Sequence, residues 1–227
     1  MKHSVTRDNP VVAVARAIVH PGNVAPRLAA AMLLVFAAVP AGAEAPHGQQ
    51  AMPAEAPAGL PLLHPASETS VDVEQLLAEL ARPDQQRWRR IERQILREWS
   101  RSGSAVVDYL FQRGQAALRS GEPRAAIAHF SAVIDHDPDF AEGWNARASA
   151  WYMENRLGQS MADLEQTLAR NPQQFAALAG MGTILEQVGE LERAREAFAA
   201  AHALNPHRDS VREALARLEL ALAGREL

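Results

Sequence analysis

Residues 107–140 read VDYLFQRGQAALRSGEPRAAIAHFSAVIDHDPDF, and their pattern recurs without a gap in residues 141–174 and 175–208. In each stretch of 34 residues the eighth and twentieth positions are small, the twenty-fourth is large and apolar, and the thirty-second is proline. Several positions that recur together at one fixed period predict stacked copies of a single supersecondary unit. The residues at these four positions are Gly114, Ala148 and Gly182; Ala126, Ser160 and Ala194; Phe130, Leu164 and Phe198; and Pro138, Pro172 and Pro206.

Each unit has the residue types of a helix pair. Small side chains let two helices approach closely, and the large apolar side chain fills the remaining space. Proline cannot donate within a helix already under way, so it is expected between one pair and the next. Gly121 and Gly189 predict the turn inside a pair, where Asn155 can adopt the same left-handed conformation. We expect Asp139 to cap the next helix, with Glu142 completing a capping box.

This pattern resembles the tetratricopeptide repeat family over residues 107–208. The resemblance implies an all-α fold, a right-handed α-solenoid of antiparallel helix pairs. Trp144, the fourth residue of the second repeat, is expected to lie buried between the two helices of that repeat. The seventh position, often leucine in the family, is Arg147. Because a charge near a helix interface needs a partner, we expect Arg147 to pair with Asp163, sixteen residues later.

Both flanks of the repeats have helical periodicity. Residues 71–106 contain two apolar stripes separated by Arg82-Pro83-Asp84, and we interpret them as an N-terminal helical cap. Residues 209–227 are interpreted as a C-terminal capping helix, with apolar residues on one face only. Such caps cover the faces that the terminal repeats of a solenoid would otherwise expose. We therefore expect one cap on the first repeat and one on the last.

The segment before the caps has the composition of an export signal and a tether. Residues 1–43 combine a basic start, an apolar run at 28–39 and the small-x-small site Ala41-Gly42-Ala43, which predicts cleavage after Ala43. The mature chain is then expected in the periplasm or outside the cell. An uncleaved membrane anchor is the competing interpretation, although the run is short for a bilayer. Residues 44–70, rich in proline and alanine, are interpreted as a disordered tether.

Charge and cysteine content exclude several classes of function. The chain has no cysteine, which excludes disulfides and thiolate chemistry. Without residues 1–43 it keeps 19 arginines against 26 aspartates and glutamates, a net charge of −7. A surplus of negative charge argues against nucleic acid or an anionic membrane as the main partner.

The sequence contains no recognisable catalytic or metal-binding pattern. Residues 135–139 (DHDPD) could supply carboxylate and imidazole ligands, but acidic residues and Asp-Pro are usual at the inter-repeat turn of the resembled family. The serines of residues 100–104 have no histidine or lysine base in sequence relation to them. Neither a phosphate-binding Gly-Lys motif nor HExxH occurs. We expect no enzyme activity, no metal, no cofactor and no small-molecule substrate.

The resemblance implies a concave groove, lined by the first helix of each repeat, where the family receives peptides or partner helices. We predict Tyr152, next to Met153, as the apolar anchor and Asn145 as a hydrogen-bonding rim residue. Phe111 and Leu118 either belong to the same patch or only pack on the N-terminal cap. The partner is a protein or peptide of unspecified identity, or a second copy of the chain. The predicted groove residues are Phe111, Gln115, Leu118, Asn145, Ser149, Tyr152, Met153, Thr183 and Glu186.

Two further observations concern the arginines. Some family members grip a C-terminal carboxylate with basic residues in the groove, but the matching residues here (Phe111, Gln115, Ala146, Ala176 and Gly180) include no basic group. That mode of recognition is therefore not expected. Residues 82–101 carry seven arginines against three acidic residues. They are compatible with an anion, lipid-headgroup or acidic-partner site, but the solvated face of an amphipathic helix is the favoured interpretation, since Trp88 and Trp99 lie on the other face.

Overall fold

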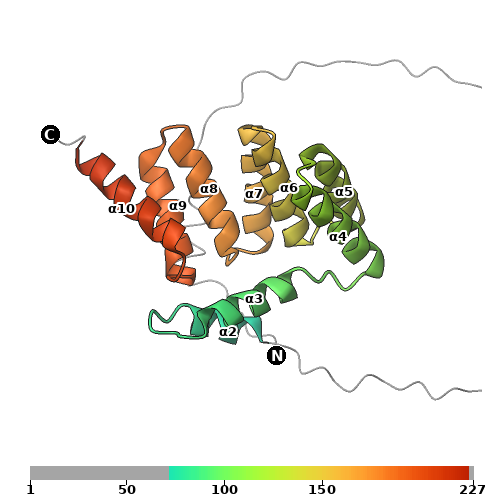
Figure 1. Ribbon diagram of the computed structural model, residues 1–227, viewed down its shortest axis with the longest axis horizontal. Helices are drawn as coiled ribbons and strands as arrows, with labels where there is room; N and C mark the ends of the chain where they lie inside the picture. Colours follow the sequence, from blue (N-terminus) through green and yellow to red (C-terminus); the bar gives the residue numbers. More distant parts are fainter. Residues whose placement is uncertain (1–71, 225–227) are drawn as a thin grey trace, which may run out of the picture. The chain divides into compact units, whose positions relative to one another are not determined.

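A computed structural model describes residues 72–224, which form helices joined by short turns and contain no strand (Figure 1). The expected signal (1–43) and tether (44–70) lie outside the described residues. The helices are α2 (Val73–Leu80), α3 (Trp88–Trp99), α4 (Ala105–Arg119), α5 (Pro123–His136), α6 (Ala141–Met153), α7 (Leu157–Arg170), α8 (Phe175–Gln187), α9 (Leu191–Leu204) and α10 (Asp209–Ala223).

The three predicted repeats are the three pairs α4–α5, α6–α7 and α8–α9, and α10 packs on α9 (Figure 1). The all-α solenoid is therefore confirmed. Each pair turns on one residue with a positive φ: Gly121 at 73°, Asn155 at 55° and Gly189 at 85°. Asparagine adopts this left-handed conformation more readily than other residues with a side chain, so the second repeat keeps the turn without glycine.

The small eighth positions allow close helix contact. A Cβ atom added to Gly114 would lie 2.4 Å from the Phe130 ring, and one added to Gly182 would lie 2.9 Å from the Phe198 ring. Glycine is therefore required where a large ring from the second helix fills the interface. In the second repeat Ser160 is buried, and its hydroxyl donates to the Ala148 carbonyl 2.8 Å away. This hydrogen bond satisfies the polar group in an apolar interface.

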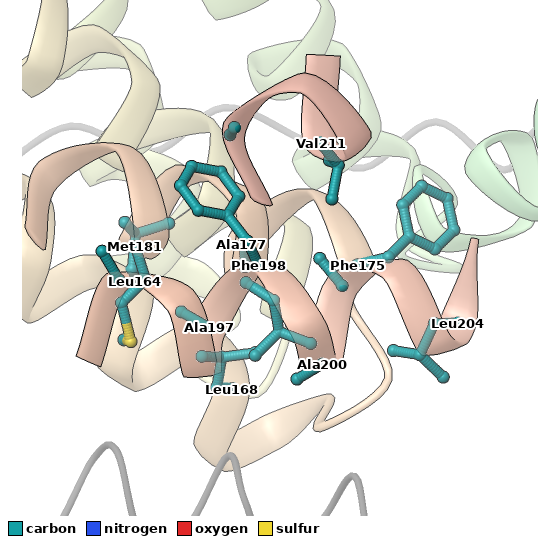
Figure 2. Close-up of a cluster of buried hydrophobic side chains, with 14 of the residues drawn as sticks. Leu164, Leu168, Phe175, Ala177, Met181, Ala197, Phe198, Ala200, Leu204 and Val211 are labelled. Carbon is teal, nitrogen blue, oxygen red and sulfur yellow. The ribbon is translucent and has the colours of Figure 1, made fainter. Parts of the chain in front are cut away.

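The buried side chains form two clusters. The smaller one joins α4, α5 and α6 around three rings, in which Phe111 packs against Phe130 and Phe140 at centroid distances of 5.6 and 5.4 Å. The larger one extends from α7 to α10 and includes α2 and α3. Figure 2 shows Phe175 and Phe198 in this second cluster, together with Val211 of α10. The C-terminal helix thus covers the last repeat as expected.

The N-terminal helices pack on the third repeat and not, as the sequence suggested, on the first. The Trp99 ring lies 5.3 Å from the Phe175 ring, and Trp88 stacks on His207 with 5.3 Å between centroids and 6° between planes. Glu92 accepts hydrogen bonds from Asn205 at 3.0 Å and Arg208 at 2.8 Å. The N-terminal cap of residues 71–106 is therefore replaced by a pair, α2–α3, that covers the turns beside α8 and α10.

The physical reason lies in which surfaces are left apolar. In the first repeat Phe111 is already covered by the rings of Phe130 and Phe140. The third repeat presents Phe175 at the start of α8, and α3 covers it with Trp99. Leu80 and Ile95 are completely buried in this contact. Burial of two large aliphatic side chains contributes about 2–3 kcal/mol each, which favours this packing.

Two local expectations were also wrong. Asp139 does not cap α6: the residue before the helix is Phe140, and the Asp139 N–H donates to the carboxylate of Asp137. Trp144 is only half-buried, because its indole N–H donates to the Pro138 carbonyl 2.9 Å away at the edge of the repeat. Its polar end therefore remains near solvent, as is common for tryptophan.

Candidate functional site

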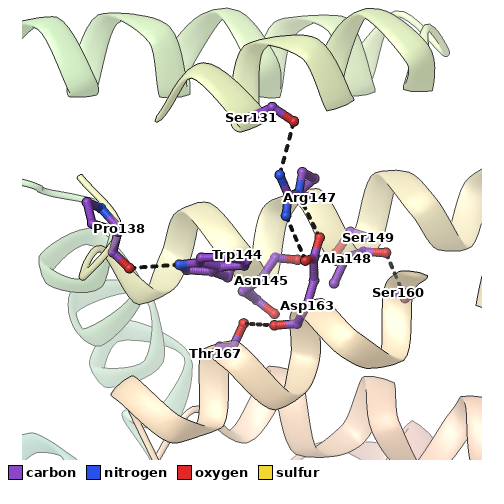
Figure 3. Close-up of polar contacts among 10 residues, drawn as sticks. All are labelled: Ser131, Pro138, Trp144, Asn145, Arg147, Ala148, Ser149, Ser160, Asp163 and Thr167. Atoms are coloured by element: carbon purple, nitrogen blue, oxygen red, sulfur yellow. Dashed lines mark hydrogen bonds and ion pairs between the residues drawn. The ribbon is translucent and has the colours of Figure 1, made fainter. Parts of the chain in front are cut away.

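The predicted ion pair between α6 and α7 is present and holds the middle repeat together. Arg147 donates to Asp163 through Nε at 2.7 Å and through Nη2 at 2.9 Å, and its Nη1 donates to Ser131 of α5 at 3.1 Å (Figure 3). Asp163 is buried and Arg147 is half-buried. A bidentate pair of this kind fixes orientation as well as distance. It sets the rotation of α6, whose other face carries the predicted anchor.

A pocket of about 290 Å³ opens between α6 and α8, with α7 at its base. Tyr152 and Met153 lie at its mouth, with 42% and 53% of their surfaces exposed. Large apolar side chains exposed together beside a concavity are typical of interaction sites. The lining residues are Asn145, Ala148, Ser149, Tyr152, Met153, Ser160, Leu164, Ala176, Gly180, Thr183 and Ile184.

Three polar residues that line the pocket use their side-chain donors within the chain. Ser149 donates its hydroxyl to the Asn145 carbonyl at 3.1 Å, and Thr183 donates to the Ala179 carbonyl at 3.0 Å. Asn145 uses its amide N–H groups on Glu142, at 3.2 Å from each carboxylate oxygen. With their donors occupied in this way, the side-chain oxygens of these residues remain able to accept. The rim can therefore receive N–H groups of an extended backbone.

Glu142 lies behind the rim and is linked to the next repeat. Gln174, which is completely buried, donates its Nε2 to Glu142 at 2.6 Å. Burial raises the pKa of Glu142 to about 7, against the lowering effect of the hydrogen bonds from Asn145 and Gln174. The Oε1 atom of Gln174 is buried without a partner among the described residues. A protonated Glu142 can donate as well as accept, so this cluster joins Asn145 to a group that titrates near neutral pH.

Five of the nine predicted groove residues come together at this pocket: Asn145, Ser149, Tyr152, Met153 and Thr183. The other four do not.

Phe111 is buried in the first cluster, against which Leu118 also packs. Gln115 lines a different pocket of about 550 Å³ between α3 and α4. Glu186 accepts two hydrogen bonds from Arg217 of α10, at 2.8 and 2.9 Å, and so helps to attach the C-terminal helix.

Some residues that line the pocket opposite α6 were not among the predicted site residues. Gly180 and Ile184 of α8 and Leu164 of α7 line it, although none was among the predicted site residues. A signal for the opening exists in the sequence, since Ala176 and Gly180 give α8 small side chains one turn apart. Their small size leaves the space that the longer side chains of α6 surround.

Two features are absent from the described residues, 72–224. No group of three or more histidine, aspartate or glutamate side chains in this range could hold a metal ion. No helix in this range combines the length and apolar character needed to cross a membrane.

Comparison with known proteins identifies the family. A sequence model of the tetratricopeptide repeat matches residues 111–175 and 155–209. A TPR repeat-containing protein of Rhizobium etli is 31% identical over 153 residues, which cover 67% of this chain and 75% of that protein. The chain belongs to the tetratricopeptide repeat family. The DnaJ homolog subfamily C member 3 of Mus musculus is 26% identical over 115 residues, which are 51% of this tetratricopeptide repeat chain and 23% of that protein.

Solved structures support the same fold. The first TPR of Spaghetti (RPAP3), bound to the HSP90 peptide SRMEEVD, has a TM-score of 0.51 and 22% identity, covering 53% of this chain and 95% of that domain. The Sgt2 TPR domain from Aspergillus fumigatus has a TM-score of 0.51 and 18% identity, covering 54% and 83%. At this level of identity the likeness establishes the arrangement of the helices in this tetratricopeptide repeat protein.

Proposed function

We propose that this tetratricopeptide repeat protein is a non-enzymatic interaction module that binds an extended segment of another protein in the α6–α8 pocket. The observation that carries the proposal is the pair of exposed side chains, Tyr152 and Met153, at the mouth of a pocket with an apolar base. The pocket volume of about 290 Å³ is large enough for one large apolar side chain. The Spaghetti domain, a similar fold, holds a peptide in its solved structure.

The rim supplies the complementary half of the recognition. Asn145, Ser149 and Thr183 surround the pocket with oxygen acceptors, and an extended chain carries N–H donors on alternate sides. An aromatic anchor surrounded by hydrogen-bonding groups is the usual composition of an interface hot spot. Together they favour a peptide backbone with one apolar side chain inserted between α6 and α8.

We further propose that the protein acts in the bacterial periplasm or cell envelope. The support is the basic and apolar pattern of residues 1–43 with its small-x-small site. In that compartment the partner is an envelope protein, and removal of residues 1–43 releases the repeats from the membrane. N-terminal sequencing of the exported protein should begin at Glu44, whereas retention of residues 28–43 would indicate a membrane-anchored adaptor.

The test of the pocket is a peptide-display selection on the full-length protein, followed by fluorescence anisotropy with the selected peptides. Selected sequences should share one large apolar residue. Tyr152→Ala should weaken their binding about 30-fold or more, since loss of a hot-spot anchor costs about 2 kcal/mol. Tyr109→Ala is the matched control, because Tyr109 is 62% exposed on α4 and lines none of the pockets described above.

Equal effects of the two tyrosine variants would place binding elsewhere and contradict the proposal. Light scattering during size-exclusion chromatography separates the remaining alternative. A dimer that dissociates on Tyr152→Ala would show that the occupant is a second copy of this chain.

A further inference from the structure

We propose that the pocket between α3 and α4 is a second binding site, which receives an acidic, extended segment of a partner protein. The pocket, with a volume of about 550 Å³, is lined by Arg93, Arg97 and Leu96 on one side and by Gln112 and Gln115 on the other. It exists because α3 lies against the third repeat while still facing the first helix of the first repeat.

Two arginines of this pocket, Arg93 and Arg97, form no ion pair with an acidic residue of the described chain. Glu92, on the same helix, is engaged by Arg208 and Asn205, and Glu98 lies 3.9 Å from Arg101. Neither Arg93 nor Arg97 forms an ion pair with another described residue. Their guanidinium groups are therefore available to carboxylates, which arginine binds through two parallel hydrogen bonds.

The facing helix provides few competing charges. Asp108 also lines the pocket, but its Oδ1 accepts from the Ser102 N–H at 2.9 Å and from the Ser102 hydroxyl at 2.7 Å. Gln112 and Gln115 present neutral amides that can both donate to and accept from a peptide backbone. The pocket thus combines cationic groups for acidic side chains with amide groups for the main chain.

The spacing of the two arginines specifies the conformation of the ligand. Arg93 and Arg97 are one turn apart on α3, which separates them by about 6 Å along the helix axis. Alternate residues of an extended chain point to the same side and are separated by about 6.7 Å. Acidic residues at alternate positions of an extended segment therefore have nearly the spacing of Arg93 and Arg97 along α3, whereas two adjacent acidic residues point to opposite sides.

The same observations argue against a membrane or a nucleic acid. A basic helix binds an anionic membrane by inserting its apolar face, but on α3 Ile91 and Ile95 are buried and Trp88 and Trp99 pack against His207 and Phe175. Proteins bind single-stranded nucleic acid on exposed aromatic rings, but the ring in this pocket, Phe111, is only 2% exposed. The whole chain is also acidic, with a net charge of −4.

The test uses the full-length protein and a fluorescein-labelled peptide of four alternating Glu-Thr pairs, measured by anisotropy at about 0.15 M salt, where charges beyond about 8 Å are screened. Arg93→Gln combined with Arg97→Gln should weaken binding about tenfold or more, since two charge-assisted contacts are lost. Arg87→Gln combined with Arg90→Gln is the control: it removes the same charge from the start of α3, at a different pocket. We expect less than about threefold weakening for this control.

Two further probes complete the test. A peptide of the same composition, Glu-Glu-Thr-Thr repeated twice, has no two glutamates at alternate positions and should bind more weakly than the alternating one. Tyr152→Ala should not change binding of the alternating peptide, so failure of this site and failure of the α6–α8 pocket are distinguishable. Equal weakening by the two arginine pairs, no binding by the wild-type protein, or tighter binding of single-stranded DNA or phosphatidylserine vesicles would overturn the proposal.

Discussion

At the scale of single residues, the second repeat departs from its neighbours and each departure has a local solution. Ser160 replaces alanine at the small twentieth position of the repeat, and its hydroxyl donates to the Ala148 carbonyl. Arg147 occupies a position where the family often has leucine, and it donates hydrogen bonds to Asp163 and Ser131. A buried polar group costs free energy unless it is hydrogen-bonded, so these partners are what make the substitutions tolerable.

The first prediction concerns the Arg147–Asp163 pair. Because Asp163 is buried, Arg147→Ala should leave an uncompensated charge and lower the free energy of unfolding by about 3–5 kcal/mol. Asp163→Ala should have a comparable effect, and the double variant should recover part of the loss, with a coupling of about 0.5–3 kcal/mol. Urea unfolding followed by circular dichroism measures all three.

The control pair is Arg124 and Glu154, whose Nε–Oε2 distance of 3.0 Å is similar although the Arg124 side chain is 88% exposed. Exposed ion pairs are worth about 0–1 kcal/mol, so this cycle should show little coupling. If the two cycles gave the same coupling, burial of Asp163 would not be the source of the effect.

A second prediction follows from the pKa of Glu142, which burial raises to about 7 from the ordinary value of 4.5. Between these values the folded chain keeps a proton that the unfolded chain has released, so the contribution of Glu142 to stability is fully present below about pH 4.5 and is lost as the pH rises through 7. Glu142→Gln should match the wild type at low pH. Above pH 7 it should be more stable by at most about 3 kcal/mol.

Unfolding midpoints in urea at pH values from 4.5 to 8 test this slope, with Glu219→Gln on the exposed face of α10 as the control. The control should follow the wild-type pH dependence. A Glu142→Gln variant that kept the wild-type slope would show that Glu142 titrates at its ordinary pKa in the folded protein.

At the scale of helices, the 34-residue period was sufficient to predict the three pairs because their contacts are local, and the one apolar face of residues 209–223 predicted α10. Gly114 meets Phe130, and Gly182 meets Phe198, sixteen residues away in both cases. Turn residues such as Gly121 determine the backbone conformation only over the few residues of the turn itself. Contacts between residues so close in sequence lie within a single repeat, so the repeat pattern predicts them.

The packing of α2 and α3 could not be predicted in the same way. Their apolar faces were visible in the sequence, but such a face is compatible with either end of a solenoid. The choice depends on His207, Arg208 and Asn205, more than one hundred residues from Trp88 and Glu92, which meet them. No periodicity connects residues so far apart.

The candidate pocket was predictable to the same extent. Asn145, Ser149 and Tyr152 share one face of α6 at helical spacing, so the repeat register alone brought them together. Phe111 lies outside the α6–α8 pocket because the Phe130 and Phe140 rings of its own repeat cover it. Glu186 was misassigned because Arg217 comes from α10, outside the repeats. The repeat register predicts which face of a helix a residue occupies, but not which side chains cover it or pair with it.

At the scale of the whole described chain, the repeats belong to two separate core clusters of different size. The first repeat has its own group of three rings, whereas the third repeat shares its core with α2, α3 and α10. Helix α3 thus contributes to the stability of the third repeat. It also lines a pocket together with α4, the first helix of the first repeat. In a solenoid each unit can open locally, so loss of one contact should affect the repeat that it supports.

The last prediction uses this difference between the two core clusters. Ile95 and Val133 are both completely buried, Ile95 in the larger cluster and Val133 in the smaller one. Ile95→Ala should cost about 2–5 kcal/mol, and Val133→Ala should be similarly disruptive. In native-state hydrogen exchange, Ile95→Ala should reduce protection in α8, α9 and α10 while leaving α4 and α5 protected, and Val133→Ala should do the reverse. If Ile95→Ala instead exposed α4 and α5, the N-terminal helices would be a cap on the first repeat, and the pocket proposed between α3 and α4 would lose its geometric basis.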